Sequence, residues 1–195
     1  MKKLAFKMVI LLLLVSPSLI ACQQKTADPA ELTAGHIVDF AKIISYDTAQ
    51  DVIADSVLIV EVTKLREEPF SQDLGYGAAE HFTLSHVQVN QVIRPMDRSA
   101  IKAGDELRIL ESEWTDPLAP QIIHHTEGYV KMTVQKDYTL YLGHNKGNDT
   151  FYPLGLLYGK IPHDPEEAVI WGDTLDPQIA SVLKELNNKA DPAQP

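Results

Sequence analysis

The hexapeptide Val57-Leu58-Ile59-Val60-Glu61-Val62 sets the fold class of the chain. It is short, β-branched and apolar at almost every position, as is typical of a strand buried on both faces. Two later segments, Leu107 to Ile109 and Tyr138 to Leu142, alternate apolar and polar residues with a period of two. Together these patterns predict a mainly β domain.

A long strand follows the first one, and its pattern changes phase. Phe82 and Leu84 alternate in one phase, and Val87 and Val89 continue in the other. A β-bulge produces such a slip and bends the strand, which favours a closed or strongly coiled sheet. Between the two strands we expect a long loop from Arg66 to Ala79, because this segment carries one proline and two glycines.

The remaining segments are connections and weaker strands. Lys102 to Asp105 predicts a turn, and Trp114 to Gly128 predicts a long connection. Tyr129 to Val134 is a weaker strand candidate. Phe151 to Ile161 is apolar but interrupted by proline and glycine, which indicates a corner or a close approach of two backbone segments. His36 to Tyr46 fits either a helix or a short first strand.

Two helices are expected. Asp47 or Thr48 is suited to cap a short helix that ends at Ala54, with Val52 and Ile53 turned inward. Near the end of the chain, apolar residues recur at the spacing i, i+3, i+4 and i+7, which predicts a helix with one buried face. Asp176 is a natural cap for it, and Pro177 fits its first turn. The four apolar residues are Ile179, Val182, Leu183 and Leu186.

Residues 1–21 have the pattern of an export signal. Three lysines precede an apolar run from Met8 to Val15, which is far shorter than the ~20 residues of a membrane-spanning helix. Leu19-Ile20-Ala21-Cys22 resembles the lipobox of bacterial lipoproteins. The resemblance implies cleavage before Cys22 and a diacylglyceryl group on its thiol, which anchors the protein stably through two acyl chains. The alternative is a plain secretory signal with a chance cysteine.

Charge and cysteine content limit the partners. Residues 22–195 hold 14 basic and 27 acidic side chains, a net charge of −13. Such a surface repels phosphate backbones, so we expect no nucleic acid partner. It also disfavours lying flat on anionic lipid, which leaves the acyl chains as the tether. Cys22 is the only cysteine, so its lipidation leaves no thiol for a disulfide, a metal site or catalysis.

The order of elements resembles the OB-fold-like module of netrin C-terminal domains and tissue inhibitors of metalloproteinases. Small bacterial lipoproteins look similar. The similarity covers roughly Asp47 to Ile161 and rests on four segments: Ala54–Val60, Val87–Ile93, Leu107–Ile109 and Asp137–Leu142. It implies an OB-like closed or partly closed barrel of five to six strands with a C-terminal helix. The animal modules carry disulfides, and the inhibitors chelate zinc through a free N-terminal cysteine. Neither feature fits this chain, so the inhibitory mechanism is not carried over.

The predicted organisation has four parts. A lipoprotein signal peptide spans residues 1–21, and a flexible, polar spacer spans residues 22–35. A single OB-like barrel domain with its helix spans residues 36–187. A disordered tail spans residues 188–195.

Histidines are the main candidates for a metal site. His81 and His86 are five residues apart and so face opposite sides of a strand, unless a bulge brings them together with Glu80. His124 and His125 follow Trp114 in the long connection. Zinc needs three or four converging ligands. Solvated or hydrogen-bonded histidines are the alternative, and no metal ligand is assigned.

Three other patterns are weaker. The acidic residues before and at the start of the last helix could hold calcium, but their spacing matches no EF-hand, and a solvated surface is the alternative. Gly155 to Lys160 is one residue short of a phosphate loop and is interpreted as a strand corner. Tyr76 lies in the loop between the first two long strands, through which OB-folds often bind ligands. The acidic residues are Asp164, Glu166, Glu167, Asp173 and Asp176.

The expected function is a non-catalytic binding or interaction module at the cell envelope. The chain lacks the common catalytic signatures, such as Gly-x-Ser-x-Gly and His-Glu-x-x-His. We expect anchoring in the cell membrane or outer membrane, a domain outside the cytoplasm, no cofactor, and an envelope protein, peptide or glycan as ligand. The alternatives are a metal-dependent or histidine-using envelope enzyme and a structural envelope protein.

Overall fold

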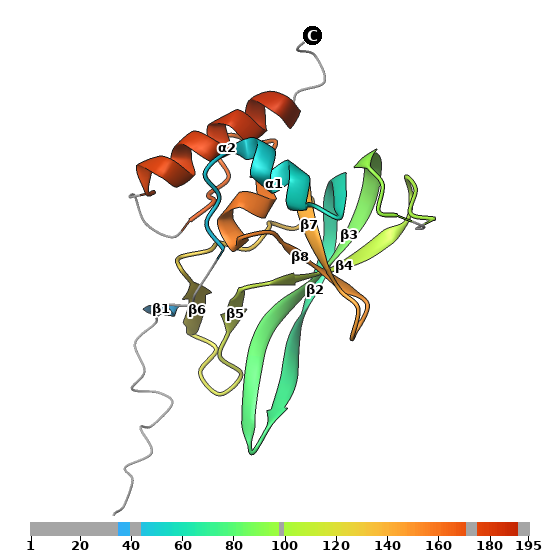
Figure 1. Ribbon diagram of the computed structural model, residues 1–195. Helices are drawn as coiled ribbons and strands as arrows, with labels where there is room; N and C mark the ends of the chain where they lie inside the picture. Colours follow the sequence, from blue (N-terminus) through green and yellow to red (C-terminus); the bar gives the residue numbers. More distant parts are fainter. Residues whose placement is uncertain (1–34, 40–43, 98–99, 171–174, 191–195) are drawn as a thin grey trace, which may run out of the picture.

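A five-stranded closed β-barrel forms the centre of the protein (Figure 1). The computed structural model describes residues 35–39, 44–97, 100–170 and 175–190. The barrel order is β2 (Leu58–Gly75), β3 (Ala78–Arg94), β4 (Glu106–Glu111), β8 (Thr150–Pro153) and β7 (Asp137–Asn145), and the pairing of β2 with β7 closes it. Within the barrel, as far as the described residues form it, β4 and β8 are the one parallel pair. The sixth strand of the sheet, β9 (Lys160–Pro162), pairs with β7. The predicted OB-like barrel is therefore confirmed.

The first half of β2 is buried on both faces, as its sequence predicts. Leu58, Val60 and Val62 belong to the apolar core inside the barrel. Ile59 points the other way, into a second cluster that contains Tyr141 and the buried faces of the helices. A strand between two cores has no solvated face, so its sequence is continuously apolar.

The bend predicted between Leu84 and Val87 exists, but the extra residue lies on the partner strand. The β2–β3 register shifts between Lys64 and Arg66, which pair with Val87 and His86. Two more shifts, between Ile59 and Val60 and between Glu61 and Val62, follow towards the start of β2. Bulges increase local twist, and these three of the four register shifts in the strand pair help the sheet to close on itself.

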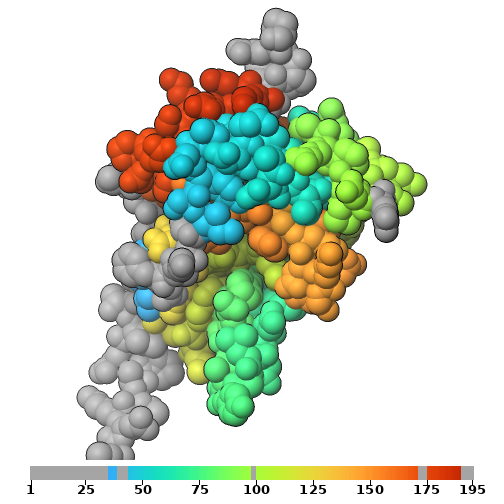
Figure 2. Space-filling view, in the orientation of Figure 1, coloured from blue at the N-terminus to red at the C-terminus, as the bar shows by residue number. Residues whose placement is uncertain are grey.

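The expected loop from Arg66 to Ala79 is wrong, because the two strands continue as a ladder to the pair Gly75–Ala78. Tyr76 and Gly77 form a two-residue turn in which both have positive φ, 56° and 78°. The proline that suggested a loop, Pro69, lies where β2 no longer pairs with β7, and a proline is tolerated on such an edge. We call residues 66–82 the arm; it projects from the barrel in Figures 1 and 2.

A small second sheet lies beside the base of the arm. It consists of β1 (Gly35–Asp39), β6 (Ile122–Thr126) and β5 (Glu113–Thr115), with β1 parallel to β6 and β5 antiparallel to it. The predicted long connection from Trp114 to Gly128 therefore contains a hairpin. The sequence left a helix and a short strand as alternatives for His36 to Tyr46, and the structure has a strand at residues 35–39. This strand includes Gly35, the last residue of the predicted spacer.

Tyr129 to Val134 was predicted as a strand, and this prediction is wrong. The segment crosses one end of the barrel and buries Tyr129 and Met132 completely or nearly so, at 0% and 1% exposure. Two of its backbone N–H groups are satisfied by side-chain carboxylates: Met132 donates to Glu111 and Lys131 donates to Glu113, at 2.7 and 3.2 Å. Side-chain carboxylates thus replace the ladder bonds that a strand would make.

Two helices cover the outer face of β7 and β9. The short helix α1 (Ala49–Asp55) is capped by Thr48, whose hydroxyl accepts from the Asp51 N–H, and Val52 is buried as predicted. Helix α2 (Pro177–Ala190) is capped by Asp176, which accepts from the Gln178 N–H at 2.8 Å. The helix continues to Ala190, three residues past the boundary predicted at residue 187. The predicted corner is the turn η2 (Leu156–Gly159).

Neither helix of the described residues has the length and apolar character that a membrane crossing requires.

Candidate ligand-binding groove

A groove of about 230 Å³ lies between the arm and the segment that follows β5. The arm contributes Phe70 and Phe82, which are partners in the β2–β3 ladder, and Trp114 and two prolines of the following segment also line the groove. Thr83 fixes the spacing of the walls, because its hydroxyl donates to the carbonyl of Glu113 at 2.7 Å. Figure 2 shows the arm standing beside this segment. The groove therefore has aromatic walls held by strands.

Trp114 is held from both sides by histidines. Its ring stacks on His124 at a centroid distance of 4.0 Å and an angle of 7°, because the two residues are paired across the β5–β6 hairpin. His81 of the arm stacks on Trp114 at 4.6 Å and 30°. His81 is oriented by Ser71, which is 2.8 Å from its Nδ1. The stack joins the arm to the small sheet along the groove wall.

The inner end of the groove is charged. Lys131 binds Glu67 at 2.8 Å and lies 3.7 Å from Glu113. Burial alone would raise the pKa of the Glu67 carboxyl, but hydrogen bonds from Lys131 and Lys64 outweigh this effect and lower it. Burial likewise opposes the charge of Lys131, yet the bond to Glu67 raises its pKa overall. Both groups are therefore charged at neutral pH, and each neutralises the other.

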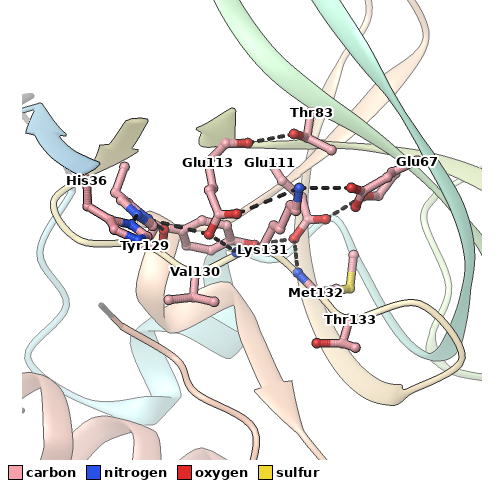
Figure 3. A network of polar contacts seen from close by, with 12 residues as sticks. His36, Glu67, Thr83, Glu111, Glu113, Tyr129, Val130, Lys131, Met132 and Thr133 are labelled. Carbon is pink, nitrogen blue, oxygen red and sulfur yellow. Dashed lines mark hydrogen bonds and ion pairs between the residues drawn. The ribbon is translucent and has the colours of Figure 1, made fainter. Parts of the chain in front are cut away.

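Behind this end lies a cluster of charges with no access to solvent (Figure 3). Glu111 is 0% exposed and accepts hydrogen bonds from Lys64 at 3.2 Å, Tyr129 at 2.8 Å and the Met132 N–H at 2.7 Å, and from the Ser85 hydroxyl. Lys64, also 0% exposed, donates to Glu67 at 2.5 Å and to the Met132 carbonyl at 2.6 Å. With both groups fully satisfied, this cluster holds the barrel end together and offers no free group to a ligand.

The histidines do not converge on a metal site. His81 and His124 approach one another, but the Trp114 ring lies between them. His86 faces away from both and lies 2.7 Å from Glu106 and 3.1 Å from Glu68. Among the described residues, which include all seven histidines, no group of three His, Cys, Asp or Glu side chains is placed to hold a metal ion.

His125 lies in the small sheet, away from the stack. Its Nδ1 donates to the carbonyl of Tyr129 at 2.9 Å, and its Nε2 lies 2.6 Å from Nδ1 of His36 on β1. Its burial is nearly complete, with 1% exposure. The residue therefore joins β1 to β6 and to the segment that closes the barrel.

The acidic residues near the last helix bind different partners within the protein. Asp164 binds Lys136 at 2.7 Å, Glu167 accepts from Tyr138 at 2.9 Å, and Asp176 caps α2. Asp173 lies outside the described residues. These contacts do not favour the calcium hypothesis. Cys22, the predicted lipidation site, also lies outside the described residues.

The segment from Gly155 to Lys160 is the predicted corner and not a phosphate loop. Gly155 has a φ of 51° and begins the turn η2, and Lys160 is 1% exposed within β9. Its ammonium donates to the carbonyl of Val130 and lies 4.6 Å from the centre of the Tyr129 ring. Burial lowers the pKa of Lys160 to about 8, although Glu111 and Glu113 partly oppose this effect.

The sequence did not identify the groove. The sequence around Trp114 predicts a connection, and Glu67 and Lys131 are isolated charges of a kind that is common on surfaces. The separation of ten residues between Trp114 and His124 becomes informative only once they are known to pair across a hairpin. Tyr76, which the sequence did single out, lies at the tip of the arm and is fully exposed.

Comparison of the chain with models of known protein families and with curated protein sequences finds no match.

Proposed function

We propose that this protein is a lipid-anchored lipoprotein of the cell envelope whose barrel is a non-catalytic binding module. The groove beside the arm is the observation that carries the proposal. Its aromatic walls are fixed by a ladder, a hairpin and the Trp114 stack, so a ligand meets a preformed surface and loses little free energy to its rearrangement. The lipobox at Cys22 supports anchoring in the cell membrane or outer membrane.

The groups at the groove support binding more than catalysis. A general base or nucleophile must be able to reach a substrate with a lone pair to offer. Glu67 is bound to two lysines, and His81 is held by Ser71 and stacked on Trp114. These groups therefore shape the groove and set its charge.

The walls and the charge indicate the ligand class. The described acidic side chains that line the groove are Glu67, Glu68 and Asp116, and Lys131 is already paired with the first of them. The remaining charge is negative, so a cationic group on the ligand is favoured. An extended polypeptide segment of an envelope protein that carries a lysine or arginine between apolar residues fits both features.

The anchor and the groove need separate tests. Cys22→Ser should abolish lipidation and release the mature protein from membranes. A photoreactive residue in place of Phe70, inside the groove, should crosslink in cells to a polypeptide through a segment containing lysine or arginine. The same residue in place of Tyr152, on β8 outside the groove, should not.

A charge reversal tests the ligand class. Glu68→Lys should weaken the Phe70 crosslink, whereas Glu185→Lys, the same change on the exposed face of α2, should leave it intact. Equal crosslinking from positions 70 and 152, or no effect of Glu68→Lys, would contradict the proposed site.

A further inference from the structure

The turn at the tip of the arm contains a residue that the fold does not explain. Two-residue hairpin turns with positive φ at both positions favour Asn-Gly, because most side chains are strained there. This turn has Tyr76 at φ 56° followed by Gly77 at φ 78°. Tyr76 is 110% exposed, so no contact within the protein compensates for the strain. An aromatic side chain at this position therefore indicates a contact outside the molecule.

The rest of the tip, residues 74–79, is uncharged. Leu74 is 57% exposed, and the other members are glycine and alanine apart from Tyr76. The carboxylate of the preceding Asp73 accepts from the Gly75 N–H at 2.7 Å and so is bound within the turn. The end of the arm is thus a small apolar surface on an acidic protein.

A second apolar side chain lies on a neighbouring loop. Leu118, in the loop between β5 and β6, is 86% exposed. Among the exposed large apolar residues of the described part of the chain, Tyr76 and Leu118 are the two most exposed. Both segments extend in the same direction, because β4 runs antiparallel to β3 and continues through β5 into this loop (Figure 1).

The chain enters the domain from the same end. Strand β1 is parallel to β6, and its first residue, Gly35, pairs with Ile122 at the end of this loop and donates its N–H to the carbonyl of Gln121. Gly35 lies thirteen positions after Cys22 in the sequence. This stretch can span at most ~45 Å. A lipid anchor at Cys22 therefore keeps this end of the domain close to the bilayer.

We propose that the tip of the arm and Leu118 insert into the interface of the membrane that holds the anchor. This inference rests on the lipid anchor of the proposed function. Tyrosine is favoured at the level of the lipid headgroups, because its ring is apolar and its hydroxyl can stay hydrated. Leucine adds apolar surface that can be buried among the acyl chains. The net charge of −13 favours zwitterionic over anionic lipid. Together the lipid anchor and the inserted side chains fix the orientation of the domain. The groove then lies between the arm and the loop that carries Leu118.

Lipidated protein in phosphatidylcholine–phosphatidylethanolamine vesicles tests the insertion. The tip is labelled with an environment-sensitive fluorophore at Ala79→Cys, which leaves Leu74 and Tyr76 in place. Cys22 is lipidated, so no other thiol reacts. We expect a blue shift of the emission and quenching by lipids that carry a quencher near the headgroup. The same label at Ile93→Cys, at the other end of β3, should remain in water.

Substitution separates insertion from mere proximity. Leu74→Ser, Tyr76→Ser and Leu118→Ser combined should abolish the blue shift, and Ile44→Ser, an exposed apolar residue next to the helices, should not. A tip label that stays in water, or one that is shielded only after envelope protein is added, would overturn the inference.

Flotation of the same vesicles reports on the anchor separately. Protein that fails to float would contradict the proposed anchoring. Protein that floats with its tip label in water would contradict only the insertion.

Discussion

Glu111 shows at the scale of one residue why a buried charge is not by itself an active site. Its carboxylate has no exposure, and four donors from four different residues use its lone pairs. A buried ion pair contributes little net stability compared with apolar residues, but removing one partner leaves an uncompensated charge. The residue therefore acts on the stability of the barrel end.

Removal of either partner of the Lys64–Glu111 pair should be strongly destabilising. We expect Glu111→Gln and Lys64→Met each to lower the free energy of unfolding by about 3–5 kcal/mol, measured by urea denaturation. The double variant Lys64→Met/Glu111→Gln should lose less than the sum of the two single losses, because neither charge of the pair is then left without its partner. Additive losses would show that the pair is not coupled.

Gly159 predicts a second residue-level effect, from close backbone packing. A Cβ atom at this position would lie 2.2 Å from the backbone nitrogen of Leu154. Gly159→Ala should therefore destabilise the protein by about 1–3 kcal/mol or more. Gly147→Ala is the matched control, since its nearest neighbour is a side-chain oxygen of Asn145 at 3.3 Å. Equal urea midpoints for the two variants would contradict the close approach.

At the scale of elements, the sequence was informative where periodicity and burial agree. The strand at residues 57–62, the strand at 137–145 and the last helix follow from their patterns because each has faces that are uniformly buried or exposed. The arm did not follow, because its residues are mostly exposed on both faces and its Pro69 and glycines resemble a loop. Tyr129 to Val134 did not follow either, since two of its backbone N–H groups bond to Glu111 and Glu113, which are distant in sequence.

The cap of α2 predicts an effect of a single element. Asp176 accepts from the N–H groups of Gln178 and Ile179, at 2.8 and 3.4 Å. Asp176→Ala should lower the free energy of unfolding by about 1 kcal/mol, because these donors lose their partner. Asp176→Ser keeps a capping oxygen and should retain most of the stability. Thermal or urea unfolding distinguishes the two, and an equal loss in both would show that the negative charge matters more than the cap.

At the scale of the whole molecule, the sequence predicted the barrel but not the groove. The individual strands follow from several consistent apolar patterns, each readable within a few residues, but these patterns do not give the order of the strands in the sheet. The groove depends on the arm, the β5–β6 hairpin and Lys131, which approach only after the barrel closes. Its stack joins His81 to Trp114 and His124, a relation that no local pattern encodes. The site is therefore a product of topology.

The protonation of buried groups should give the whole molecule an alkaline stability maximum. Burial lowers the pKa of Lys160 to about 8 in the folded state, from 10.5 in the unfolded chain. Between these values the unfolded chain binds more protons, so the free energy of unfolding should rise with pH, by up to about 3 kcal/mol. Above pH 10 the trend should reverse. Burial raises the pKa of Tyr46 and Tyr141 to about 12, so the unfolded chain loses these protons first.

Urea unfolding at pH 7, 8, 9 and 10, followed by tryptophan fluorescence, measures this profile. Lys160→Met is the test variant: it should remove the rise between pH 8 and 10, because it removes the group whose pKa differs between the two states. At pH 7 the Lys160→Met variant should be more stable than the parent, because an apolar side chain of similar length replaces a buried charge. The gain in the free energy of unfolding is reduced because the Val130 carbonyl loses its hydrogen-bond donor. Lys184→Met, an exposed lysine on α2, should keep the rise. A parent protein whose stability falls steadily from pH 7 to 10, or a Lys160→Met variant with an unchanged slope, would show that Lys160 is not the group that responds.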